Sequence, residues 1–173
     1  MNTFNRPEWT PQIPAGMRVL VTGATGGLGR ALVGMLLQGP DCTIGAHGNS
    51  QVFDSDDARV MPLQKSFDTE ESCRVLVDDF ASRAGGIDAL VILSGAIHFS
   101  GHWKDMEGAD WEREMAINLN QPFYLARAAM RHMSESGGGR ILLTGTESAL
   151  HGGSATSFPA TTWSGTCGAW RPA

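Results

Sequence analysis

The residues best placed to do chemistry are glycines that follow a short apolar run near the N-terminus. Gly23, Gly27 and Gly29 come after the apolar residues 19–21, and apolar residues at helical spacing follow them. A buried strand, a glycine turn and a helix in this order form a cradle for a pyrophosphate, which accepts hydrogen bonds from backbone N–H groups at the helix N-terminus. We therefore expect a nucleotide-binding turn, with Gly23 allowing the sharp turn, Gly27 the close approach of backbone to ligand, and Gly29 the packing of helix on strand.

Strand and helix signals alternate along the rest of the chain. The predicted strands, each a short apolar run, span residues 19–21, 42–46, 58–63, 89–93 and 140–144. The predicted helices, each with apolar residues at helical spacing, span residues 27–38, 70–84 and 111–134. Parallel strands joined by helices form a doubly wound sheet with right-handed crossovers. We therefore predict an α/β fold with one Rossmann-type parallel sheet.

The net charge, the apolar runs and the cysteines of the sequence exclude several classes of binding partner. The net charge is −5 and only two lysines are present, so a basic surface for nucleic acid is not expected. No apolar run reaches the length of a membrane span, and no basic and apolar leader opens the chain. The three cysteines are odd in number and far apart, which suits a reducing compartment and offers no metal-ligand spacing. We expect a cytoplasmic protein that binds neither nucleic acid, membrane nor metal.

Residues 22–29, with the sequence Thr-Gly-Ala-Thr-Gly-Gly-Leu-Gly, resemble the cofactor loop of the short-chain dehydrogenases/reductases. Three later motifs match the same family in the same order: Gly-Gly-Ile-Asp-Ala-Leu-Val at 85–91, Ala-Ile-Asn-Leu at 116–119 and Gly-Gly-Gly-Arg-Ile-Leu-Leu at 137–143. On these residues the chain is identified as a member of that family over residues 18–150. The resemblance implies a Rossmann fold with strand order 3-2-1-4-5, an NAD(P) cofactor and a small-molecule carbonyl or alcohol substrate.

The resemblance divides the chain into three parts. Residues 1–16 hold three prolines and little apolar periodicity, and we expect an extended N-terminal arm. Residues 17–150 form the expected NAD(P)-binding Rossmann domain. Residues 151–173 depart from the family as a divergent tail, and the family's sixth and seventh strands have no counterpart, so the domain is expected to be truncated.

The family's cofactor contacts fall on three loops of this chain. By resemblance they are Gly23, Thr25, Gly26, Gly27, Leu28 and Gly29 after the first strand, Asn49 and Ser50 after the second, and Ser94 and Gly95 after the fourth. The second strand ends in Ala-His-Gly-Asn-Ser, without the Asp that grips a ribose 2′-hydroxyl, so NADP is preferred over NAD. The alternative is that Asn49 and Ser50 are ordinary turn residues. Ser66 stands where the family has an Asp beside the adenine, and Ile-Leu-Ser-Gly replaces Asn-Asn-Ala-Gly, so binding is expected to be weak.

The family's catalytic positions are only partly kept. Family members use a Tyr as acid and base, a Lys that lowers the pKa of that Tyr, a Ser that polarises the substrate oxygen and an Asn that orders a water. Here Asn118 matches the Asn, with hydrogen bonding to local backbone as the alternative role, and Thr146 matches the Ser, with Ser148 as a second candidate. Phe158 and Thr162 stand at the Tyr and Lys positions.

The missing Tyr and Lys bear directly on activity. A phenol with a pKa of about 10 is a poor base near neutral pH unless a nearby positive charge favours its ionised form. The only tyrosine, Tyr124, lies within the predicted helix 111–134, where it is expected to pack. We therefore expect an NAD(P)-dependent oxidoreductase by family that is inactive in hydride transfer. Two alternatives stay open: a non-catalytic nucleotide-binding or regulatory protein, and a truncated or frame-shifted gene product.

The long predicted helix carries an apolar face that the tail is poorly suited to cover. In the family this helix packs beside the helix that bears Tyr and Lys, and the two build a dimer interface. Pro159, Gly165 and Gly168 disfavour that second helix here. We expect that the chain forms a homo-oligomer through residues 111–134 or is marginally stable; the alternative is that aromatic residues of the tail fold back as an irregular cover.

Overall fold

Strands and helices alternate along the chain in the computed structural model, which describes residues 13–99, 101, 103–145 and 168–170. The strands are β1 (Met17–Thr22), β2 (Cys42–Gly48), β3 (Val60–Gln64), β4 (Ala89–Ile92), β5 (Gly139–Leu143) and β6 (Gly168–Trp170). The helical elements are α1 (Gly27–Leu37), α2 (Glu70–Ala84), the 3₁₀ turn η1 (Trp103–Asp105), α3 (Gly108–Met115), the π-helical segment η2 (Ala116–Asn120) and α4 (Gln121–Glu135).

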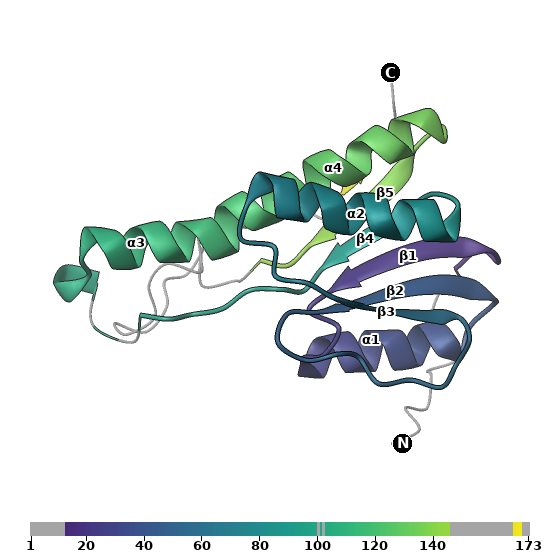
Figure 1. Cartoon of the computed structure of the whole chain (residues 1–173), viewed down its shortest axis with the longest axis horizontal. Coiled ribbons are helices and arrows are strands. Elements are labelled where there is room, and N and C mark those ends of the chain that lie inside the picture. The colour runs from purple at the N-terminus through teal and green to yellow at the C-terminus, as the bar shows by residue number, and fades with distance from the viewer. Residues whose placement is uncertain (1–12, 100, 102, 146–167, 171–173) are drawn as a thin grey trace.

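The strands form one sheet in the order β3-β2-β1-β4-β5-β6 (Figure 1). The first five are parallel, and Thr22 at the end of β1 lies opposite His47 of β2 on one side and Ile92 of β4 on the other. The strand order reverses between β1 and β4, so the carboxyl ends of these two strands flank a switch point where such sheets bind ligands. The predicted α/β fold and the order 3-2-1-4-5 are confirmed.

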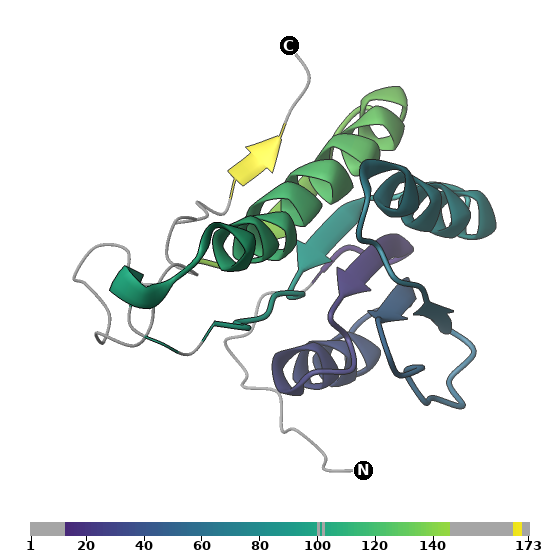
Figure 2. The same cartoon turned by 60° about the vertical axis from the view of Figure 1, so that its left-hand side comes forward.

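Helices cover both faces of the sheet (Figure 2). On one face, α2 and α4 pack against each other over a cluster that includes the fully buried Leu20, Phe80 and Leu125. On the other face, Val33 of α1 belongs to a second cluster with Ile44 of β2. The strands are apolar on both sides because both faces are covered, which explains their continuous apolar runs in the sequence.

Arg18 and Asp88 lock β1 to β4 at the end of the sheet opposite the switch point. The Arg18 guanidinium donates from Nε to Oδ2 of Asp88 at 2.8 Å and from Nη2 to Oδ1 at 2.6 Å. The backbone N–H of Arg18 donates to the same carboxylate at 2.8 Å. Together these bonds fix the register of the two central strands, whose other ends carry the loops of the switch point.

Pro62 lies in β3, which forms one edge of the sheet, opposite Ala46 of β2. The Arg59 carbonyl oxygen accepts from the Ile44 N–H at 2.8 Å, and the Lys65 N–H donates to the Gly48 carbonyl oxygen at 3.4 Å. Because the backbone groups of alternate residues point to opposite sides of a strand, those of Pro62 point away from β2. A proline fits there without removing a bond from the ladder.

The chain differs from the predictions most clearly in three parts. The helix predicted at 111–134 begins at Gly108 and becomes π-helical over residues 116–120, because apolar spacing does not reveal a single wider turn. The second strand continues to Gly48, beyond its predicted end at residue 46, so His47 belongs to the strand. Residues 168–170, in the divergent tail where no strand was predicted, form β6, which is antiparallel to β5.

Candidate functional site

The turn between β1 and α1 has a geometry that its glycines make possible. Gly23 is left-handed with φ of +73°, and a Cβ there would lie 2.8 Å from the backbone of Leu93 and Ser94. A Cβ on Gly29 would overlap the carbonyl oxygen of Gly23. Both positions therefore require glycine, which confirms the predicted sharp turn and the predicted close packing of helix on strand.

Gly27 differs from these two glycines, because a Cβ there would meet no atom of the described residues within 4 Å. α1 begins at Gly27 with no side-chain cap and no acidic residue in its first turn. The neighbouring Leu28 is 74% exposed. The start of α1 thus faces open space with the N–H donors of its first turn and the positive end of its dipole directed outward, which suits an anionic ligand.

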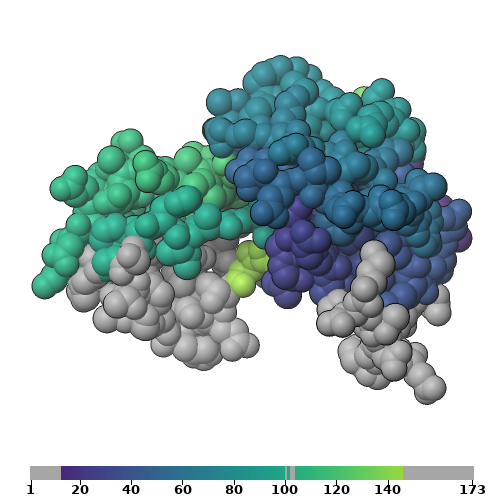
Figure 3. Space-filling view, turned by 60° about the horizontal axis from the view of Figure 1, so that its bottom comes forward, coloured from purple at the N-terminus to yellow at the C-terminus, as the bar shows by residue number. Residues whose placement is uncertain are grey.

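A cleft of about 340 Å³ opens beside this turn. Its walls bring together most of the predicted cofactor contacts: Gly23, Thr25, Gly26, Asn49, Ser50, Ser94 and Gly95. Of the others, Gly27 and Leu28 lie at the open start of α1, and Gly29 is packed against the turn. In Figure 3 the purple and blue residues of the first strands and α1 lie to the right of the green residues of α3. The cleft is lined from the loops that follow β1, β2, β3 and β4, and by Ile117 of η2 and Gln121 of α4.

Ser94 ties the loop after β4 to β1. Its hydroxyl lies 2.9 Å from Oγ1 of Thr22, a side chain that is fully buried. The Leu93 N–H donates to the Thr22 carbonyl oxygen at 3.0 Å. These bonds hold the loop against the glycine turn, so the serine that replaces a family residue has a partner within the protein.

His47 is a cleft residue that the sequence did not single out as a contact. It is 1% exposed and lies at the end of β2. Its Nε2 is 2.6 Å from the carbonyl oxygen of Lys65, and because a carbonyl only accepts, Nε2 carries the proton. Burial lowers the pKa of His47, so the ring is neutral at neutral pH and Nδ1 is a bare acceptor.

Nδ1 of His47 has no hydrogen-bond partner among the residues that the structure describes. A buried acceptor left unpaired costs about 1–3 kcal/mol. The atom itself is buried, so the unpaired acceptor is a cost of the fold beside the cleft and not a contact that the cleft offers to a ligand. The sequence could have pointed to His47, because this residue stands at the end of the second strand, where the family's ribose-binding Asp is expected.

A carboxylate also reaches the cleft near His47. Asp68 lines the cleft and accepts a hydrogen bond from the hydroxyl of Ser66. The ring of Phe67, between these two residues in the sequence, lies with its centroid 4.5 Å from that of His47. The sequence placed Ser66 where the family has an Asp and predicted a weaker adenine contact, whereas the structure brings the carboxylate of Asp68 to the cleft.

Asn118 lies in η2, and its whole side-chain amide is engaged within the protein. Nδ2 donates to the Ala96 carbonyl oxygen at 2.8 Å and to Oε2 of Glu114 at 3.0 Å, while Oδ1 accepts from the Ala96 N–H at 3.2 Å. Because Ala96 is 22 residues away in the chain, the alternative of bonding to local backbone is wrong. The water-ordering role implied by the family stays a prediction.

The remaining predicted catalytic positions, Thr146, Ser148, Phe158 and Thr162, lie outside the described residues. Tyr124 is half-buried against the core cluster under α2 and α4, which confirms its predicted packing role. Within the ranges that the structure describes, no group of three His, Cys, Asp or Glu side chains is arranged to hold a metal ion. No helix in those ranges combines the length and the apolar character needed to span a bilayer.

The fold and the site define a class of protein. A glycine turn at the switch point of a doubly wound parallel sheet, followed by an open helix N-terminus, is the dinucleotide-binding arrangement of Rossmann-type proteins. The sequence model described as short chain dehydrogenase matches residues 17–168. The chain belongs to the short-chain dehydrogenase family.

Several known proteins resemble the chain. Elsinochrome reductase 1 of Elsinoe fawcettii is 31% identical over 163 residues, which cover 89% of this chain and 58% of the relative. Versicolorin reductase stcU of Emericella nidulans is 30% identical over 142 residues, which cover 78% of this chain and 53% of the relative. The chain therefore spans about half the length of the curated relatives it matches.

Two solved structures share the fold. NADH-dependent reductase A1-R′, complexed with NAD, has a TM-score of 0.71 at 23% identity, covering 82% of this chain and 64% of that one. The short-chain dehydrogenase/reductase from Serratia marcescens BCRC 10948 has a TM-score of 0.63 at 25% identity, covering 78% of this chain and 60% of that one. Both likenesses support the Rossmann-type architecture described above.

Proposed function

We propose that this protein binds NAD(P)(H) in the cleft beside the glycine turn. The observation that carries the proposal is the geometry of that turn: Gly23 and Gly29 require glycine for packing, while Gly27 opens onto free space at an uncapped helix N-terminus. A pyrophosphate at that place accepts the N–H donors of the first helical turn. When bound, the nicotinamide ring of the cofactor gives or takes a hydride.

The sheet order supports an assignment of the two halves of the cofactor. β2 and β3 lie on one side of β1 and β4 on the other, so cleft residues after β2 and β3 would hold the adenosine half and those after β4 the nicotinamide half. Asp68, which follows β3, is assigned to the adenine amino group. NADP(H) is the preferred form, since Asn49 and Ser50 after β2 bring no carboxylate against a 2′-phosphate. Residues 17–150 form this binding unit.

The proposal covers cofactor binding and does not include catalysis of hydride transfer. Reducing a carbonyl requires a proton for its oxygen, and general acid–base catalysis contributes about 10²–10⁴-fold to the rate. Phe158 and Thr162 supply neither a phenol nor an ammonium group at the matching positions. The named relatives are reductases, so a ligand beside the nicotinamide would be a small-molecule carbonyl or alcohol. A glycine turn that keeps its geometry, beside a missing proton donor, favours a nucleotide-binding or regulatory role.

Association and location complete the proposal. Copies associate through the helical face at residues 111–134, where Phe123 is 50% exposed and Trp111 is 39% exposed. Burying each such side chain contributes about 1.5–3 kcal/mol.

The thiols of Cys42 and Cys73 are free and buried, which supports a reducing cytoplasm. The net charge of −5 argues against nucleic acid as a partner.

Titration calorimetry with NADPH and NADH tests the binding proposal. Gly27→Val is the informative variant, since its Cβ meets no described atom within 4 Å yet narrows the approach to the helix N-terminus. Gly108→Val is the matched control, because Gly108 also begins a helix and its Cβ would meet nothing within 4 Å in the described part of the chain. We expect NADPH to bind the parent and the control but not Gly27→Val. A parent that binds neither cofactor, or a Gly27→Val variant that binds equally well, overturns the proposal.

Turnover is tested separately by following NADPH oxidation with a panel of ketones. We expect no rate above the background without protein, because the proton donor is missing. A rate that saturates with ketone concentration would contradict the loss of catalysis while leaving the binding proposal intact.

A further inference from the structure

Glu114 is a buried carboxylate that the proposed function does not yet explain. It lies in α3 and is 1% exposed. Its Oε1 accepts from the backbone N–H groups of His98 and Phe99 at 2.6 and 2.9 Å, and its Oε2 accepts from Nδ2 of Asn118 at 3.0 Å. Charge-assisted hydrogen bonds from three N–H donors offset the cost of removing the carboxylate from water.

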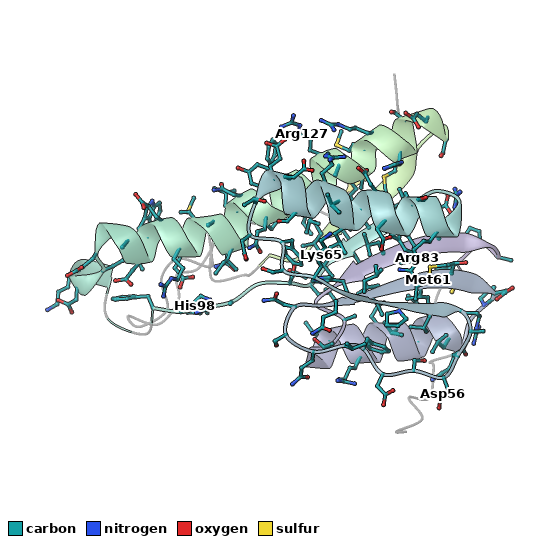
Figure 4. All side chains as sticks on the ribbon, viewed as in Figure 1. Asp56, Met61, Lys65, Arg83, His98 and Arg127 are labelled. Atoms are coloured by element: carbon teal, nitrogen blue, oxygen red, sulfur yellow. The ribbon has the colours of Figure 1, made fainter. Side chains whose placement is uncertain are left out.

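Asn118 extends this contact along the same side of the helix. It lies four residues after Glu114, so the two side chains leave neighbouring turns on one face. Its amide pairs with both the N–H and the carbonyl oxygen of Ala96. The two side chains therefore fasten the loop after β4 at three residues. Figure 4 shows His98 on this loop, below α3.

The fastened loop is one wall of the cleft. Ala96 and His98 line the cleft from this loop, and Ile117 and Gln121 line it from η2 and α4. Asn49 and Ser50, which follow β2, and Asp68, which follows β3, line another part of the cleft. Since β4 lies on the opposite side of β1 from those strands, the loop that Glu114 holds lies at one end of the cleft only.

We propose that Glu114 is a positioning residue for the cofactor: it holds the loop at residues 96–99 in the shape that the nicotinamide half of NAD(P)(H) requires and does not affect the adenosine half. The inference rests on the proposed function. Glu114 acts through the loop, because both of its oxygens are occupied by N–H donors of the protein. Without the carboxylate, two backbone donors of the loop lose their acceptor, and the loop no longer has a single position.

Glu114→Gln tests this role with little change in size. The amide keeps one acceptor oxygen and turns an NH₂ group toward an N–H donor, so at least one of the three bonds is replaced by a contact between donors. Glu112→Gln is the matched control, since Glu112 lies on the same helix and is exposed. The ligands are NADPH and adenosine 2′,5′-bisphosphate, which carries the adenosine half alone, and calorimetry gives both affinities.

We expect Glu114→Gln to bind NADPH about tenfold more weakly than the parent and the bisphosphate equally well. Amide hydrogen exchange at His98 and Phe99 should become faster, while the control changes neither affinity nor exchange. Unchanged NADPH affinity overturns the inference. An equal loss of both ligands also overturns it, because a general loss of structure produces that result.

A second variant covers the case in which Glu114→Gln does not fold. Glu114→Asp keeps the charge and withdraws it by one methylene group, and the same two affinities decide the outcome. A parent that binds neither ligand refutes the proposed function. A parent that binds both ligands, with variants that lose neither or both, refutes only the role of Glu114.

Discussion

Acidification is expected to destabilise this protein through His47. The ring is buried, its Nε2 donates to the Lys65 carbonyl oxygen, and burial lowers its pKa below the usual 6.5. In the unfolded chain the same histidine titrates near its ordinary pKa. Below that pH the unfolded state binds more protons than the folded state, so the free energy of unfolding falls as the pH falls.

The size of this effect follows from the linkage between proton binding and folding. For a single group, each pH unit between its unfolded and folded pKa values changes the free energy of unfolding by at most about 1.4 kcal/mol. The contribution of His47 is fully present above its unfolded pKa. It is lost progressively as the pH falls from there toward the lower pKa of the folded state. We therefore expect the free energy of unfolding to fall as the pH drops below the unfolded pKa of His47, by no more than that amount per pH unit.

Urea unfolding of the parent and of His47→Gln, from about pH 8 to about pH 5.5, measures the effect. Glutamine retains a donor for the Lys65 carbonyl oxygen and does not titrate. The difference between the two profiles isolates His47 from the other histidines, including His132, whose Nε2 lies 2.8 Å from Asp78. The parent should lose more stability than the variant on acidification. Parallel profiles would refute the reasoning, because they would mean that the ring titrates alike in the folded and unfolded states.

Three further changes separate pairing, packing and association. Asp88→Ala removes the bidentate pair between β1 and β4 and should lower the free energy of unfolding in urea by about 2 kcal/mol. The same change at the exposed Asp79 should leave that free energy almost unchanged, and equal effects of the two changes would contradict this. Gly29→Ala should prevent folding, followed by circular dichroism, because its methyl group overlaps the Gly23 carbonyl oxygen; a folded variant would count against the packing described. Phe123→Glu should convert a dimer into a monomer in sedimentation velocity, because the ring is half exposed on the helical face; a monomeric parent would dismiss the proposed association.

The architecture could be predicted because its signals are local. An apolar run, a glycine turn and an amphipathic helix stand next to each other in the sequence around Gly23 and Gly29, and the resemblance to a family supplied the strand order. The π-helical segment at 116–120 could not be predicted, since one wider turn leaves the spacing of apolar residues almost unchanged. β6 was missed because its three residues carry no strand signal and depend on pairing with β5.

The candidate site was less predictable, because its polar groups are defined by contacts between distant loops. His47 is distinguished by a buried ring atom, Nδ1, that has no hydrogen-bond partner within the described part of the chain, while its Nε2 contacts the Lys65 carbonyl oxygen. Neither contact property can be read from the sequence. Glu114 looks in the sequence like any glutamate on the solvated face of a helix. Its burial arises when residues 98 and 99 fold over it and donate their N–H groups.

Pro62 makes β3 a poor template for a second chain. An edge strand offers a row of N–H and carbonyl groups to which further strands can add, and repeated addition of this kind produces fibrils. The outward-facing backbone of Pro62 has no N–H group, so a strand paired with this edge would lack one backbone hydrogen bond at the middle of β3. Growth by strand addition at β3 is therefore disfavoured, and copies that meet through their helices would form a closed pair instead of an open-ended polymer.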